Sequence, residues 1–157
     1  MPDLDSTLGA YIVSQAFREI VEPFEPGQHQ FEPIRIVYAK GEEEPRPYYL
    51  MVAGQRVVIS LDQGRTRPPM REFPERPGLV NPNPGKPLQS FNSGAPIKDW
   101  APVFRHEAVA GRHLFCAADF RNYLFVSREL RRAIEDAGMK GARFLGPFAT
   151  TDDAMAG

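Results

Sequence analysis

Two stretches of the chain carry apolar residues at helical spacing, and each begins directly after a serine. The first follows Ser14 and the second follows Ser127, where a serine hydroxyl can accept a hydrogen bond from an amide of the first helical turn. A short apolar, β-prone run precedes each serine, at 11–13 and at 123–126. The second helix is expected to end before Gly138, because glycine favours the position just after a helix. The pattern of strand, serine cap and amphipathic helix therefore occurs twice.

Apolar runs outside the two helices predict several short strands. Pro33 lies within the first of these runs and favours an edge position or a bulge, because proline cannot donate a ladder hydrogen bond. Together the elements predict an α+β fold with a mixed, mainly antiparallel sheet, two serine-capped helices and a long proline-rich loop. The expected strands are 29–39, 48–52, 56–61, 102–110, 112–117 and 142–145.

Residues 63–100 break this pattern, because they hold eight of the sixteen prolines of the chain. Proline at this density excludes a regular helix or a central strand, so a long loop is expected, with Trp100 anchoring its end in the core. A length of 157 residues is typical of one domain. We therefore predict a single domain over 1–157, with a core at 11–146 and a frayed tail at 150–157.

Charge is distributed unevenly, although the formal net charge is only −1. Residues 1–62 carry ten acids and five bases, whereas residues 63–100 carry three acids and six bases. Such runs usually form solvated surface, but separate acidic and basic faces can also orient a protein partner. The candidate contact residues are Glu42, Glu43 and Glu44 for a basic partner, and Arg65, Arg67, Arg71 and Arg76 for an acidic one.

The same composition argues against other kinds of partner. A net charge near zero without a basic stripe gives no reason to expect nucleic acid binding. The longest apolar runs are far too short to span a membrane. A single cysteine, together with an acidic N-terminus that lacks the signal-peptide pattern, predicts a cytoplasmic protein.

Candidate catalytic groups are few. The only cysteine is Cys116, and His113 stands three residues before it. Residues three apart on a strand point to opposite faces, so this pair is not expected to work as base and nucleophile. The chain has no metal-ligand spacing, phosphate-binding glycine loop or carboxylate pairing. We therefore predict no catalytic residues, no metal site and no cofactor.

Two blocks of sequence carry a family resemblance. The first is Val13-Ser14 with its helix, followed by Glu25-Pro26-Gly27-Gln28-His29-Gln30-Phe31. The second runs from Ala108 through Gly111-Arg112-His113-Leu114-Phe115 and the second helix to Phe144. In their order and spacing, the blocks resemble a family of bacterial immunity proteins found beside polymorphic toxin genes, many once known only as a domain of unknown function.

The resemblance implies a cytoplasmic antidote that binds a cognate toxin domain and blocks it, without being an enzyme. The motif residues would then be structural: Ser14 and Ser127 cap helices, Gly27 and Gly138 form turns, and Phe31 and Phe144 pack. Partner specificity is expected first in the proline-rich segment 63–100, because loops on a rigid scaffold often carry it.

Two alternatives remain open from the residues. One is a small cytoplasmic hydrolase or transferase that uses His113 or Cys116. The other is an adaptor of a secretion or phage system, which would bind a partner without neutralising a toxin. An enzyme would lose function when one polar residue is replaced, whereas a binding protein would lose it gradually across a surface.

Overall fold

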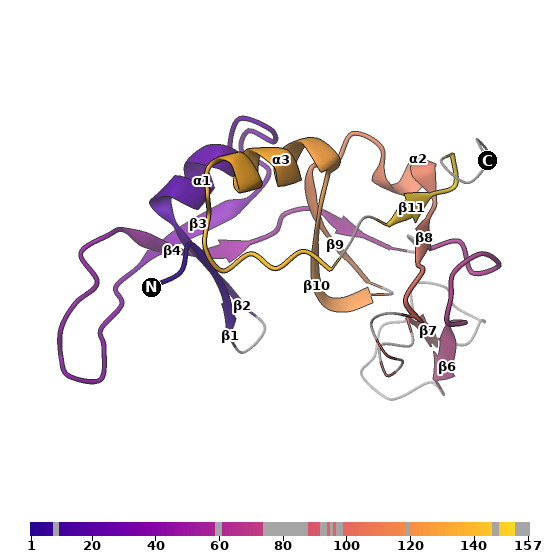
Figure 1. The fold of residues 1–157 in the computed structure, drawn as a ribbon, viewed down its shortest axis with the longest axis horizontal. Coiled ribbons are helices and arrows are strands. Elements are labelled where there is room, and N and C mark those ends of the chain that lie inside the picture. The colour runs from indigo at the N-terminus through magenta and orange to yellow at the C-terminus, as the bar shows by residue number, and fades with distance from the viewer. Residues whose placement is uncertain are drawn as a thin grey trace. The chain divides into compact units, whose positions relative to one another are not determined.

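The structure, a computed structural model, describes residues 1–7, 10–58, 61–73, 88–91, 94, 96, 99–118, 120–145 and 148–152 (Figure 1). The chain divides into two compact units whose segments alternate along the sequence. Unit 1 comprises Met1–Gln55, Arg112–Phe115 and Phe125–Phe144, and unit 2 comprises Arg56–Gly111, Cys116–Leu124 and Leu145–Gly157. The α+β class predicted from the sequence is confirmed, with mostly antiparallel strand pairs among the described residues.

Unit 1 is built on a four-stranded sheet with the order β1-β2-β4-β3, in which every neighbouring pair is antiparallel. Its strands are β1 (Leu4–Thr7), β2 (Ala10–Ser14), β3 (Gln30–Ile34) and β4 (Tyr48–Val52). Strand β1 was not predicted, because Leu-Asp-Ser-Thr neither alternates nor forms an apolar run. A distant partner fixes its start: the amides of Asp3 and Leu4 donate to the carbonyl oxygen of Lys140 at 2.8 and 3.2 Å.

Two helices, α1 (Gln15–Val21) and α3 (Arg128–Asp136), lie side by side in unit 1 (Figure 1). Each begins after its predicted serine. The Ser14 hydroxyl accepts from the amide of Phe17 at 3.2 Å, and the Ser127 hydroxyl accepts from the amide of Leu130 at 3.1 Å. These bonds satisfy amides that have no partner inside the helix.

The end of α3 follows the expected glycine geometry. Gly138 has a φ of +64°, a conformation that side chains with a Cβ rarely adopt. Its amide donates to Glu135 O at 2.9 Å, and the amide of Met139 donates to Ile134 O at 3.2 Å. This pair of hydrogen bonds is a Schellman motif, which closes the helix and turns the chain back toward β1.

The core of unit 1 lies between the sheet and the helices. Its fully or almost fully buried side chains come from β2, α1, β4, α3 and the strand β9 (Leu114–Ala117): Val13, Phe17, Val21, Met51, Leu114, Leu130 and Ile134. Burying one such side chain contributes about 1.5–3 kcal/mol. The apolar residues at helical spacing after Ser14 and Ser127 therefore mark the faces of α1 and α3 that pack in the core.

Unit 2 consists of short strand pairs and one helical turn. The strands are β5 (Arg56–Val57), β6 (Arg71–Phe73), β7 (Leu88–Ser90), β8 (Val103–Phe104) and β11 (Ala149–Thr150), with α2 (His106–Val109) after β8. β6 pairs antiparallel with β7, β8 pairs parallel with β11, and β5 pairs parallel with β9. Strand β10 (Phe120–Val126) completes the sheet β10-β9-β5.

Aromatic side chains form part of the core of unit 2. The ring of Trp100 lies 5.2 Å from Phe91 and 5.5 Å from Tyr123, both in edge-to-face geometry. Trp100 is buried, as predicted for the residue that closes the proline-rich segment. Residues 74–87 of that segment lie outside the described residues, while β6 and β7 on either side pair with each other, so the segment is not a loop throughout.

Several strand predictions were wrong. Of the predicted strand 29–39, only residues 30–34 form β3, because the chain then turns through a hairpin closed by the bond from Tyr38 N to Glu42 O. Residues 102–110 form β8 and then α2, because the amide of His106 finds a helix-capping acceptor in the hydroxyl of Thr151, at 3.0 Å. Of the predicted strand 56–61, residues 56–57 form β5 and residue 58 lies in a bend, while residues 59–60 lie outside the described residues. Residues 142–145 form no strand, because the chain turns at Gly141, whose φ is +97°.

The predicted frayed tail begins within regular structure. Thr150 lies in β11, and the amide of Thr151 donates to Phe104 O at 2.8 Å. Residues 153–157 lie outside the described residues.

Candidate functional site

The acidic run predicted as a contact lies on the hairpin between β3 and β4, residues 35–47, which we call the β3–β4 hairpin. Tyr38 N donates to Glu42 O at 2.8 Å, and Glu44 N donates to Ile36 O at 3.0 Å. An isolated bridge joins Val37 and Glu43 between them. The hairpin is therefore internally hydrogen-bonded although almost all of its residues are exposed.

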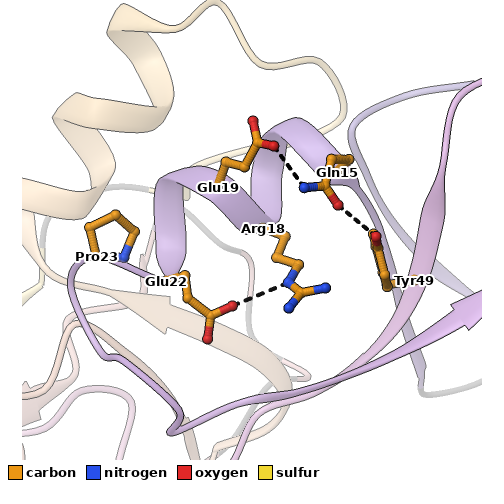
Figure 2. A pocket seen from close by; sticks show the side chains of 6 residues that line it. All are labelled: Gln15, Arg18, Glu19, Glu22, Pro23 and Tyr49. Carbon is orange, nitrogen blue, oxygen red and sulfur yellow. Dashed lines mark hydrogen bonds and ion pairs between the residues drawn. The ribbon is translucent and has the colours of Figure 1, made fainter.

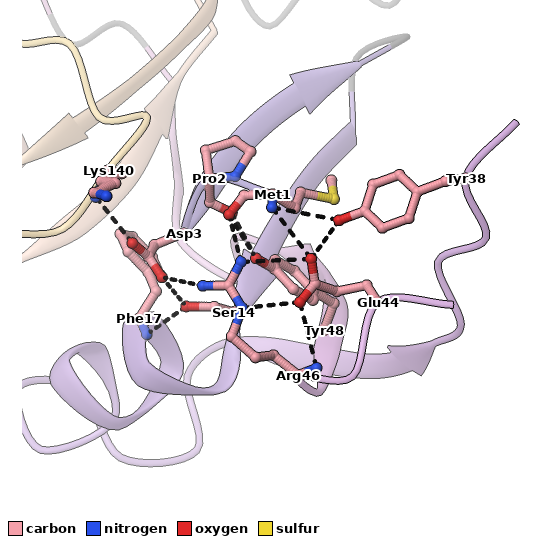
Figure 3. A network of polar contacts seen from close by, with 10 residues as sticks. All are labelled: Met1, Pro2, Asp3, Ser14, Phe17, Tyr38, Glu44, Arg46, Tyr48 and Lys140. Atoms are coloured by element: carbon pink, nitrogen blue, oxygen red, sulfur yellow. Dashed lines mark hydrogen bonds and ion pairs between the residues drawn. The ribbon is translucent and has the colours of Figure 1, made fainter. Parts of the chain in front are cut away.

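The three glutamates have different environments. Glu42 and Glu43 are exposed, and Glu43 lies 3.5 Å from the guanidinium of Arg35. The side chain of Glu44 is only 6% exposed. It accepts from Arg46 Nε at 2.9 Å, from the Tyr38 hydroxyl and from the terminal amine of Met1 at 3.1 Å (Figure 3).

These donors hold Glu44 in its charged form. Hydrogen bonds from Arg46, and then from Tyr38, lower the pKa of the Glu44 carboxyl far below its ordinary value. Arg46 also lies over the ring of Tyr48, 5.5 Å from its centroid, and Tyr48 donates to the carbonyl oxygen of Pro2 at 2.9 Å. Glu44 thus fixes the base of the hairpin to unit 1, which leaves Glu42 and Glu43 as the acids that face solvent.

Three of the four predicted arginines are described, and all lie in unit 2. Arg65 pairs with Asp62 at 3.8 Å, and Arg67 donates to the carbonyl oxygens of Gly64 and Thr66 at 2.9 and 2.8 Å. Arg71 lies in β6 and is exposed. Arg76 lies outside the described residues. The acidic and basic candidates therefore belong to different units.

His113 has a structural role. Its Nδ1 lies 2.9 Å from the hydroxyl of Ser127, the residue that caps α3, and its ring packs 5.0 Å from that of Phe24. Cys116 lies in β9, opposite Arg56 in the parallel pair with β5, and is half-buried. Each side chain is thus part of the framework of its own unit.

A buried carboxylate that sequence reasoning did not single out lies at the centre of unit 1. Glu25 is 4% exposed. Its Oε1 accepts from the amide of His113 at 2.6 Å and from Gln55 Nε2 at 2.7 Å. Its Oε2 accepts from His29 Nε2 at 2.6 Å and from the amide of Leu114 at 3.1 Å. Four donors from three chain segments therefore converge on one side chain, and we call them the Glu25 cluster.

The geometry of His29 indicates how the cluster carries its charge. Its Nδ1 accepts a hydrogen bond from the amide of Gly54 at 3.3 Å. The ring proton must then be on Nε2, which donates to Glu25, so the ring is neutral and the carboxylate holds the negative charge. Gly54 is required at this contact, because a Cβ there would lie 1.7 Å from Gln28 O.

In the sequence, the Glu25 cluster could have been suspected from the spacing of Glu25 and His29, which are four residues apart within the first resemblance block. It could not show that the other donors are main-chain amides of the second block, nearly ninety residues away. Because every oxygen of Glu25 is used and the side chain is closed off from solvent, the cluster holds the fold together and offers no open position for a substrate.

A hollow in unit 1 lies beside α1 and has a volume of about 570 Å³ (Figure 2). Arg18 extends into it, 5.2 Å above the ring of Phe31 and 5.0 Å above that of Tyr49. Its polar side chains pair with one another: Arg18 with Glu22 at 3.2 Å, and Gln15 with Glu19 at 2.7 Å. The hollow is open to solvent and presents no buried polar group without a partner.

No group of three or more His, Cys, Asp or Glu side chains in the described part of the chain could hold a metal ion. The helices among the described residues lack the length and apolar character that spanning a bilayer requires.

Comparison with known protein families identifies a relationship over most of the chain. The model of the Imm11 family, an immunity protein family, matches residues 1–146. No curated protein and no solved structure is significantly similar to the chain. The match spans both resemblance blocks and most of the chain, and it confirms the resemblance drawn from them. It also confirms the prediction of a non-enzymatic protein, since this kind of family generally acts without catalysis.

Proposed function

The chain belongs to the Imm11 immunity protein family, and from this premise we propose that it neutralises its cognate toxin by binding the toxin and covering its active surface. Membership of an immunity family implies toxin neutralisation and a toxin as partner. The finer claim, neutralisation by occlusion in the cytoplasm of the producing cell, is our proposal. The single observation that carries it is the family match over residues 1–146.

The environment of the candidate chemical groups supports binding over catalysis. His113 is bonded to the capping serine of α3, and the Glu25 carboxylate is saturated by four donors. A nucleophile or base must be within reach of a substrate, and the Glu25 side chain, which is 4% exposed, does not meet this condition.

We propose that the contact surface includes Glu42 and Glu43 on the β3–β4 hairpin if the toxin face is basic. The arginines Arg65, Arg67, Arg71 and Arg76 are the corresponding proposal for an acidic toxin face. Glu44 contributes indirectly, because its buried carboxylate holds the hairpin in place. Partner contacts within the proline-rich segment 63–100 remain a prediction.

A rescue experiment tests the proposal. The toxin domain encoded beside this gene is expressed in bacteria from an inducible promoter, with or without the present chain. We expect growth to be restored by the chain, and the two purified proteins to form a stoichiometric complex. Growth arrest despite abundant chain would contradict the immunity function, and a complex without rescue would favour the adaptor alternative.

The occlusion mechanism and the enzyme alternative need a separate measurement. Occlusion predicts that toxin activity in vitro falls in proportion to the complex formed and returns when the complex dissociates. An enzyme would instead neutralise the toxin at a substoichiometric amount of the chain. Inhibition that persists after the chain is removed would refute occlusion.

A further inference from the structure

We propose that the tip of the β3–β4 hairpin, with Val37 and Tyr38 at its apolar centre and Glu42 and Glu43 beside them, inserts into an apolar pocket with a basic rim on the toxin. This inference rests on the proposed function and names the surface and the partner chemistry that it uses. Four observations on the hairpin carry it: exposed apolar area, rigidity, charge and position.

The first observation is the exposed apolar area. Val37 is 49% exposed and Tyr38 is 41% exposed, and they are adjacent. Among the described residues, only Val52 and Val58 are other large apolar side chains with comparable exposure. Exposed apolar residues are ordinary when scattered, whereas tyrosine is enriched among the residues that anchor protein interfaces.

The second observation is that Tyr38 is already held in place. Its hydroxyl donates to Glu44 Oε2, and Glu44 is in turn bonded to Arg46 (Figure 3). The ring is exposed while its polar end is fixed, so little side-chain freedom is lost when a partner covers it. The hydrogen bonds of Tyr38 N and Glu44 N across the hairpin fix the backbone in the same way.

The third observation is the charge beside the apolar tip. Glu42 and Glu43 are exposed at the turn, and Arg35, which lies 3.5 Å from Glu43, is also exposed. Lys40 is the other base of the turn. A basic rim on the partner would complement the two carboxylates and steer association, since complementary charges raise the rate of encounter.

The fourth observation is position. The hairpin joins the inner strand β4 to the edge strand β3, and it extends beyond their paired ends (Figure 1). Ile34 and Tyr48 are the last residues paired in this register. A turn that projects from a sheet edge can enter a concave surface, which a flat sheet face cannot do.

Binding of paired variants to one probe tests the inference. The probe is the purified toxin domain encoded beside the gene, inactivated by substitution, and affinity is measured by titration calorimetry. We expect Val37→Ser and Tyr38→Ala each to weaken binding by about tenfold to about a hundredfold, the range of anchor residues. Val52→Ser is the matched control, because Val52 is 52% exposed at the opposite end of β4; its affinity should stay within about twofold.

The charge component has its own test. Replacing Glu42 and Glu43 together by Gln should lower the association rate and flatten the dependence of affinity on salt between about 0.05 and about 0.5 M. Glu32→Gln, an exposed acid on β3, is the control. Salt dependence identical to that of the unmodified chain would overturn the proposed basic rim.

The outcomes separate this inference from the proposed function. If the unmodified chain binds and neutralises the toxin while Val37→Ser and Tyr38→Ala bind as tightly, the tip is not the anchor but the immunity function stands. If the unmodified chain does not bind, both fail. Val37→Ser removes no hydrogen bond of the hairpin, so its result decides the case even if Tyr38→Ala disturbs the fold.

Discussion

Glu25→Gln tests whether the buried carboxylate holds unit 1 together. Glutamine has nearly the same shape but replaces one oxygen by an NH₂ donor. If the NH₂ takes the place of Oε1, it faces the amide of His113 and Gln55 Nε2; if it takes the place of Oε2, it faces the amide of Leu114 and His29 Nε2. In both orientations, two hydrogen-bond donors face the NH₂ group of the glutamine, which is itself a donor.

The side-chain donors can adapt, but the main-chain donors cannot. Gln55 could rotate its amide only by giving up the hydrogen bond that its oxygen accepts from Arg112. His29 could move its proton to Nδ1 only by giving up the bond from Gly54 N. One buried amide, of His113 or Leu114, stays without an acceptor, at about 1–3 kcal/mol. The weakened charge-assisted bonds add about 1–2 kcal/mol.

The expected total is therefore about 2–5 kcal/mol, a large share of a domain stability of about 5–15 kcal/mol. The measurement is urea and thermal unfolding followed by circular dichroism, with an expected fall in the midpoint temperature of about 4–20 °C. Glu22→Gln is the control, because Glu22 is 35% exposed and its ion pair with Arg18 is worth at most about 1 kcal/mol. A loss within about 1 kcal/mol for Glu25→Gln would refute the reasoning.

Three further predictions follow from single contacts. Gly54→Ala should destabilise the protein by about 3 kcal/mol or more, measured by urea unfolding, because its Cβ would lie 1.7 Å from Gln28 O and the main chain must shift. Ser127→Ala should cost about 1–2 kcal/mol, and a double-mutant cycle with His113→Ala should show coupling, because the Ser127 hydroxyl serves both the helix and the ring. Glu44→Gln should reduce the loss of stability at acid pH. The pKa of Glu44 is lower in the folded protein than in the unfolded chain, so the Glu44 carboxylate stabilises the fold above the unfolded pKa near 4.5, and this stabilisation is lost as the pH falls further. Equal slopes of unfolding midpoint against pH, between about pH 5 and about pH 3, would contradict this last expectation.

Local patterns identified the helices of unit 1 because the information is local. An apolar face at helical spacing, a serine cap and a glycine at the C-terminus all lie within about ten residues of one another. The same holds for β4, whose apolar run is continuous. Elements whose limits depend on distant partners were missed or misplaced. β1 starts where Lys140 O accepts its amides, and α2 starts where Thr151 caps it.

The candidate site shows the same division. Glu42 and Glu43 were recognisable as charged turn residues, and the structure places them on an exposed hairpin. Glu44 could not be told apart from them, because its burial depends on Arg46, Tyr38 and the N-terminus closing around it. Charge alone in a run of three glutamates carries no information on which of them faces solvent.

The placement of the Glu25 cluster bears on how an immunity protein of this family achieves specificity. Both resemblance blocks contribute to it: Glu25 and His29 come from the first block, and His113 and Leu114 come from the second. In this chain the two blocks therefore meet in a buried cluster that joins distant segments, and buried side chains cannot contact a toxin. We therefore expect selectivity to depend on exposed residues that this buried cluster supports. The β3–β4 hairpin meets this requirement, because it is fixed at its base by Glu44 while its tip contributes nothing to the core.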